Sequence, residues 1–144
     1  MSSVQISGFG INVSDLDRST EFYTRGLGLV EKAKYDLGHM HEVLVGDESD
    51  SASILLIKYT SRSGAPDLGT GYEKIVLVVD DVAGVYERAL AEGGSSETEP
   101  KTIEKMGLTV AMVRDPDGYL IEVGQSTGLL KGHLAKTRPE DLPG

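Results

Sequence analysis

The sequence predicts an α+β fold in which two tandem βαβββ modules form a cup-shaped mixed sheet. Three observations predict it: an alternating strand pattern followed by a helical pattern near the N-terminus, a second copy of this arrangement later in the chain, and a tight-turn motif around residue 117. Each module has one apolar sheet face to bury, and a cup between paired faces is where a binding site is expected.

The first module begins with residues 4–13, whose alternation predicts a strand. Its two faces are Ile6, Gly8, Gly10 and Asn12 on one side, and Phe9, Ile11 and Val13 on the other. A helix is predicted next, because Ser14 or Asp15 can cap its start and Gly28 can end it.

Three further strands complete this module. They are expected at about residues 29–35, 40–46 and 52–59, followed by a linker rich in glycine and proline at 61–71. We therefore expect a single domain over residues 1–126, with modules at about 4–60 and 71–126. Residues 127–144 form a C-terminal tail.

The second module repeats the first with a spacing of 66 residues (94 − 28). Val13-Ser14-Asp15-Leu16 corresponds to Val79-Asp80-Asp81-Val82, Gly28 to Gly94, and the turn Asp47 to Ala52 to Val113 to Gly118. Asp115-Pro116-Asp117-Gly118 favours a tight turn between strands at 108–113 and 119–124.

Composition excludes several classes of partner. The chain has 144 residues with 14 Lys or Arg and 23 Asp or Glu, a formal net charge of −9 that disfavours nucleic acid and anionic lipid. Cysteine is absent, which excludes disulfides and favours a cytoplasmic location. No stretch reaches the ~20 apolar residues of a membrane span.

Two motifs resemble those of a known family. Residues 13–23, through Leu27-Gly28, resemble the opening strand and helix of the glyoxalase/bleomycin-resistance group of the vicinal oxygen chelate family, and Asp115-Pro116-Asp117-Gly118-Tyr119-Leu120-Ile121-Glu122 resembles its last hairpin. The resemblance covers about residues 4–126. It implies the fold of that family and a homodimer that forms two cups.

The resemblance also implies where a metal would bind. Metalloenzymes of the family take ligands, usually His or Glu, from the first and fourth strands of each module. These positions correspond here to Gly8, Leu56, Lys74 and Glu122, and only Glu122 can bind a metal. We therefore expect no metal and no other cofactor, with His39 and His41 as the alternative ligands.

Lys74 and Glu122 are the main catalytic candidates. Strand alternation places both on the concave face of the second module, where the ammonium group can replace the lost cation. Lys74 would then polarise a substrate carbonyl while Glu122 moves a proton as general base. The alternative is a structural salt bridge, or a Lys74 that extends to solvent.

His39 and His41 are two residues apart, so they project to one side of a strand, and imidazoles suit acid/base catalysis. An exposed strand explains the same spacing. His133 lies in the tail beside Lys131 and Lys136 and is expected to be solvated.

The remaining candidates would bind substrate. They are Asn12, Leu56, Lys58, Tyr59 and Tyr119, with Tyr35 and Tyr72 as further tyrosines that line the cup or pack in the core. Gly8, Gly10 and Leu56 leave the first half of the cup roomy and apolar, which favours a hydrophobic or planar small molecule.

Three functions remain open. The leading hypothesis is a metal-independent isomerase- or lyase-type enzyme that transfers a proton next to a carbonyl of a hydrophobic small molecule. The alternatives are a protein that sequesters a ligand without chemistry, as bleomycin-resistance proteins do, and a glyoxalase-type metalloenzyme.

Overall fold

The computed structural model describes residues 3–49 and 51–126 and confirms the α+β fold. The first half folds into β1 (Gly8–Asn12), α1 (Leu16–Glu21), the π-helix η1 (Phe22–Gly26), β2 (Val30–Asp36), β3 (Met40–Gly46) and β4 (Ser53–Tyr59). The second half folds into β5 (Ile75–Val78), α2 (Val82–Ala91), β6 (Ser95–Ile103), the 3-10 helix η2 (Glu104–Met106), β7 (Leu108–Arg114) and β8 (Leu120–Ser126).

Each half forms a four-stranded mixed sheet with the same strand order. The orders are β1-β4-β3-β2 and β5-β8-β7-β6. β1 is parallel to β4 and β5 is parallel to β8, whereas the other pairs are antiparallel. β1 and β5 therefore occupy equivalent sheet edges, and the predicted repeat is confirmed in the strand pairing.

The two helices start at equivalent aspartates. The side chain of Asp15 accepts a hydrogen bond from the backbone N–H of Arg18, and Asp81 does the same for Gly84. Asp15, rather than Ser14, is therefore the cap of α1. Gly28, with φ of +84°, follows the end of η1 as predicted, because a left-handed residue stops a helix.

The first strand is shorter than the predicted segment 4–13. β4 begins at Ser53, which lies opposite Gly8, so residues before Gly8 have almost no partner strand to pair with. Val4 and Ile6 are consequently 95% and 79% exposed.

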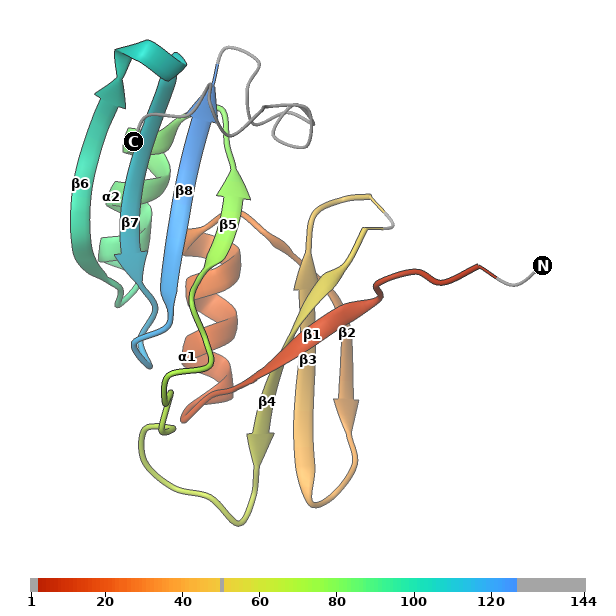
Figure 1. Ribbon diagram of the computed structural model, residues 1–144. Helices are drawn as coiled ribbons and strands as arrows, with labels where there is room; N and C mark the ends of the chain where they lie inside the picture. The colour runs from red at the N-terminus through yellow and green to blue at the C-terminus, as the bar shows by residue number, and fades with distance from the viewer. Residues whose placement is uncertain (1–2, 50, 127–144) are drawn as a thin grey trace.

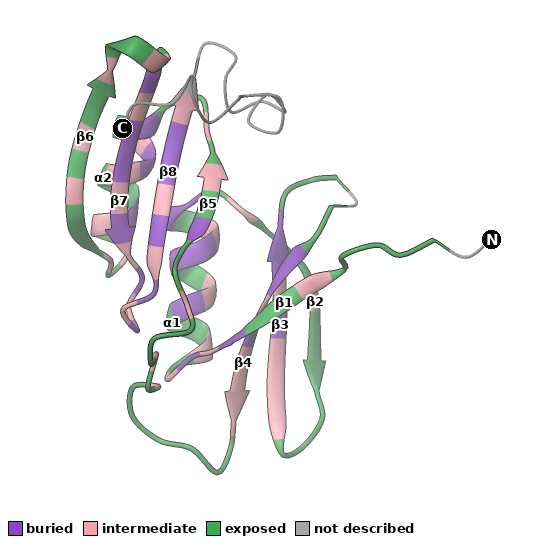
Figure 2. Cartoon of the chain, viewed as in Figure 1, coloured by how far each residue is buried: buried purple, intermediate pink, exposed green. Residues whose placement is uncertain are grey.

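The helices lie between the two sheets (Figure 1). α1 packs against β3 and β4, α2 packs against β6, β7 and β8, and α2 also contacts η1. Buried side chains concentrate on the helix-facing sides of the strands (Figure 2), with Phe22, Tyr23, Leu56, Ile121 and Val123 fully buried. We call the side of each sheet that faces away from the helices its open face. None of the helices among the described residues is long and apolar enough to cross a membrane.

Candidate functional site

The open face of the second sheet bears an ion pair. Lys74 Nζ lies 3.2 Å from Glu122 Oε1, and the two side chains are 31% and 22% exposed. Their predicted proximity is confirmed, and Lys74 is not directed away into solvent. Glu122 is in the middle of β8, between Val76 of β5 and Met112 of β7. Both charged groups are therefore held by the sheet yet accessible to a ligand.

The matching position in the first module is Leu55, and the assignment to Leu56 is wrong. Gly10 pairs with Leu55 and Val76 pairs with Glu122, so the spacing between β4 and β8 is 67 residues (122 − 55). A shift of one residue in a strand moves the side chain to the other face. Leu56 is 0% exposed and belongs to the core, so it cannot bind substrate.

The first open face is closed at the position of the expected ligand. A Cβ atom on Gly8 would lie 2.5 Å from the carbonyl oxygen of Ser53 and 2.6 Å from Leu55 Cδ1. Because the nearer atom belongs to the backbone, any side chain at this position would require β1 to move away from β4. The first module therefore presents apolar surface where the second presents charge.

The residues at the four positions do not fit a divalent metal. Gly8, Leu55 and Lys74 supply no ligand, and the single carboxylate of Glu122 is already paired with an ammonium group. Over residues 3–49 and 51–126, no three His, Cys, Asp or Glu side chains are grouped so as to hold an ion.

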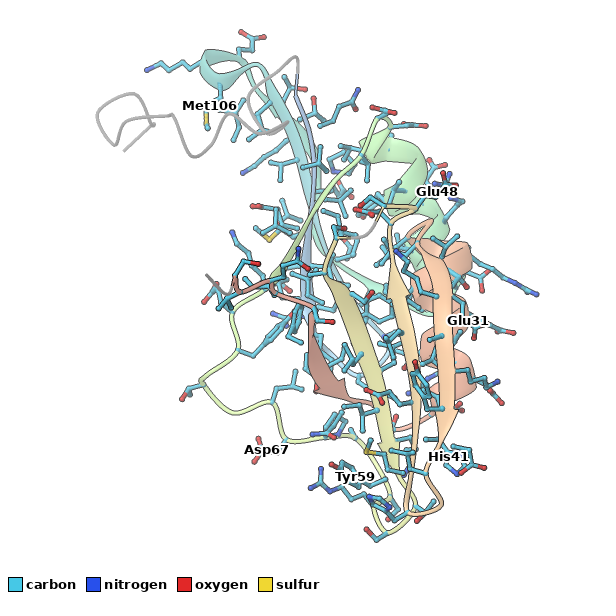
Figure 3. All side chains as sticks on the ribbon, turned by 90° about the vertical axis from the view of Figure 1, so that its right-hand side faces the viewer. Glu31, His41, Glu48, Tyr59, Asp67 and Met106 are labelled. Carbon is cyan, nitrogen blue, oxygen red and sulfur yellow. The ribbon has the colours of Figure 1, made fainter. Side chains whose placement is uncertain are left out.

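The histidines and Lys58 do not lie where they were predicted. His41 shares a strand face with the buried Val43 and Val45, so it lies on the helix side, 3.4 Å from Asp36. His39 lies in the turn before β3, with its ring centroid 6.3 Å from that of Tyr59. Figure 3 shows His41 and Tyr59 at the same end of the first sheet.

Lys58 is directly opposite His41 and shares its face. Its ammonium group donates to the carbonyl oxygens of Tyr59, at 2.8 Å, and of Arg62. These bonds fasten the end of β4 to the linker, so a role for Lys58 in substrate binding is not supported. His133 lies outside the described residues.

Asn12 and Tyr59 continue the open face, as expected from alternation with Gly10 and Ile57. Tyr119 does not: it is 6% exposed, and its hydroxyl donates to the carbonyl oxygen of Asn12 at 2.8 Å. Its ring packs edge-on against Tyr72, with centroids 5.1 Å apart. Tyr119 therefore links the modules instead of binding substrate.

Sequence reasoning missed Glu42. Glu42 pairs with Ile57 and with Tyr35, and directly opposite residues share a face, so this carboxylate lies on the open face of the first sheet. The signal was the alternation of Glu42 with Leu44 in β3.

A buried acid joins the two modules. Asp115 is 3% exposed and accepts hydrogen bonds from the Tyr23 hydroxyl at 2.8 Å and from the backbone N–H groups of Asp117 and Tyr119 at 2.9 Å. Burial raises the pKa of Asp115 even though these bonds favour its charged form. Burial, with the nearby Asp115 charge, also raises the pKa of Tyr72 to about 12. This network lies on the helix side and is structural.

Named relatives of the chain are lyases. It is 36% identical over 135 residues to a probable lactoylglutathione lyase of Vibrio cholerae, covering 88% of this chain and 94% of that protein. It is 32% identical over 116 residues to lactoylglutathione lyase GLX1 of Arabidopsis thaliana, covering 78% of this chain but only 41% of that longer protein.

Solved structures share the fold. The trypanothione-dependent glyoxalase I of Leishmania major superposes with a TM-score of 0.76 at 25% identity, over 93% of this chain and 95% of that one. The family model described as Glyoxalase/Bleomycin resistance protein/Dioxygenase superfamily matches residues 5–123. With that match spanning both modules, the chain belongs to the glyoxalase/bleomycin resistance protein/dioxygenase superfamily.

Proposed function

We propose that this protein is a metal-independent enzyme of the superfamily that transfers a proton next to a carbonyl group of a hydrophobic small molecule, as an isomerase or lyase does. The observation that carries the proposal is the Lys74–Glu122 ion pair on an open sheet face. It stands where the first and fourth strands of the second module would present metal ligands.

Each group of the pair has a chemical task. The Lys74 ammonium has three N–H donors, so it can keep its bond to Glu122 while donating to a substrate carbonyl oxygen. Negative charge that develops on this oxygen is stabilised by the ammonium. The Glu122 carboxylate then removes the proton from the adjacent carbon. The lyase names of the relatives support this class of chemistry only coarsely.

A homodimer would complete the site. The helices lie between the sheets of one chain, so the two open faces point outward and do not face each other. A twofold pair can place the first open face of one copy opposite the second open face of the other. Exposed apolar residues along β1 and β5 support such contact, among them Phe9, Val76 and Val78. Light scattering should then give about twice 15.4 kDa.

The test measures proton transfer directly. Hydrophobic enolisable ketones that stabilise the protein in a thermal-shift screen are incubated with it in D2O, and exchange at the α-carbon is followed by NMR. We expect Glu122→Gln and Lys74→Met each to reduce exchange by about 100-fold or more. Glu97→Gln is the matched control, because Glu97 forms a 3.0 Å surface ion pair with Arg114 in the same sheet. Equal exchange in Glu122→Gln and the unmodified protein would refute the base role.

A lactoylglutathione lyase that requires metal is the second candidate, favoured by the names of the relatives. It predicts turnover of the hemithioacetal of methylglyoxal and glutathione that depends on added Ni²⁺ or Zn²⁺. A ligand-sequestering protein is the third, and it predicts tight binding of a compound recovered unchanged with no α-carbon exchange.

A further inference from the structure

The open face of the first sheet has a level, apolar centre. A Cβ atom on Gly10 would lie 2.8 Å from Ile57 Cδ1, and one on Gly8 would lie 2.6 Å from Leu55 Cδ1. The side chains of Leu55 and Ile57 therefore extend over the two glycines and cover the backbone of β1. Leu44, which pairs with Leu55, continues this surface onto β3. We call these five residues the platform.

One border of the platform is polar. Ile57 pairs with Asn12 on β1 and Glu42 on β3, and Glu42 pairs with Tyr35 on β2. These four residues form a row across the sheet on the same face. The row offers an amide and a carboxylate beside an apolar floor, so it can bind a hydroxyl group at the end of an apolar ligand.

A cavity of about 400 Å³ lies at this border. Asn12, Ile57 and Tyr59 line it from the sheet, and linker residues 62–67 line it from the opposite side. The Arg62 guanidinium lies 4.6 Å from the centroid of the Tyr59 ring, which extends the flat surface at the cavity wall. The volume is within the range of small-molecule pockets. Asp67 marks the linker at this end of the sheet in Figure 3.

From these features we infer that the first module selects a flat aromatic ketone that bears a hydroxyl group. The ring would lie on the platform, its hydroxyl would donate to Glu42, and its carbonyl would face Lys74 of the opposing module. A flat ring keeps all its atoms in contact with a level surface, whereas a puckered ring does not. A peptide-like ligand would bury polar groups on the platform without partners. This inference rests on the proposed function.

Three probes test the inference: 6-acetyl-2-naphthol, 2-acetylnaphthalene, which lacks the hydroxyl, and 2-acetyldecalin, which is saturated. Dissociation constants are measured by calorimetry on the full chain. We expect 6-acetyl-2-naphthol to bind about tenfold or more tightly than 2-acetylnaphthalene, because a hydroxyl donates to a charged acceptor. Glu42→Leu should abolish this preference, whereas Glu97→Leu, at an exposed position, should preserve it.

Two variants test flatness. Gly10→Val displaces the end of Ile57 and should weaken both aromatic probes by about fivefold or more, with less effect on 2-acetyldecalin. Ile57→Val removes the atom above Gly10 without adding bulk, and it should give a smaller loss in the same direction, which guards against misfolding of the first variant.

The outcomes separate this inference from the proposed function. Equal affinity for the saturated and aromatic probes, a hydroxyl preference that survives Glu42→Leu, or no binding at the solubility limit would overturn the inference. Tight binding of 6-acetyl-2-naphthol without α-carbon exchange would support the inference and overturn the enzymatic proposal. Exchange of ketones without preference for flat rings would do the reverse.

Discussion

The two modules place different chemistry on equivalent strands. On the first open face, β1 and β4 present Gly8 and Leu55, which form apolar surface. On the second, the corresponding positions are Lys74 and Glu122, an ion pair with its nitrogen and oxygen 3.2 Å apart. A repeated backbone therefore does not imply a repeated site, and in this protein one half offers a surface while the other offers reactive groups.

The turns that follow β3 and β7 differ in the same way. Asp47 and Asp115 each come directly after the strand. Asp47 is exposed, and hydrogen bonds from Ser49 and Ser51 lower its pKa. Asp115 is enclosed beneath Tyr23, and burial raises its pKa. Burial, and not the place of the residue in the repeat, decides the properties of these carboxylates.

The largest expected effect tests the register of β4. Leu56→Glu puts a carboxylate into the core without a partner and should cost about 4 kcal/mol of unfolding free energy or prevent folding. Leu55→Glu puts the same group on the open face and should cost about 1 kcal/mol or less. Urea denaturation measures both. If the two variants lose equal stability, the assignment of the faces is wrong.

The next effect tests the two turns. Asp115→Ala leaves the Tyr23 hydroxyl and the N–H groups of Asp117 and Tyr119 without acceptors, which should cost about 3 kcal/mol. Asp47→Ala removes only exposed local bonds and should leave the urea midpoint nearly unchanged. Similar midpoints for the two variants would contradict the contrast between the turns.

The pH dependence of stability gives a smaller effect with a definite sign. Because the pKa of Asp115 is raised on folding, its contribution is most favourable below 3.8 and is lost as pH rises through the folded pKa. Asp115→Asn has no such titration, and its amide can donate to the Tyr23 oxygen. The stability of Asp115→Asn relative to the unmodified protein should therefore increase with pH in urea titrations. Parallel curves would contradict this assignment.

The sequence was sufficient for the fold because its local signals agree. Asp15 and Asp81 cap helices 66 residues apart (81 − 15), and the strands between them alternate clearly. The same spacing correctly identified Lys74 and Glu122. It failed for Leu56, because residues 54–57 are apolar on both faces and show no alternation, and because the turn after β3 is one residue longer than the turn after β7.

His41 was misplaced although a signal existed. Val43 and Val45 continue its alternation and are buried, so its face is the covered one. The smallest expected effect follows: His41→Gln should change α-carbon exchange by less than about twofold, against the large loss in Glu122→Gln. A large loss in His41→Gln would mean that the helix side of the sheet contributes to the reaction.

The central claim is that an ammonium group has taken the place of a divalent ion. Native mass spectrometry of protein purified without chelator, then titrated with Ni²⁺ and Zn²⁺, tests it most directly. We predict no ion held in a one-to-one ratio with each chain and α-carbon exchange unaffected by EDTA. One tightly bound ion per chain whose removal abolishes exchange would contradict the account.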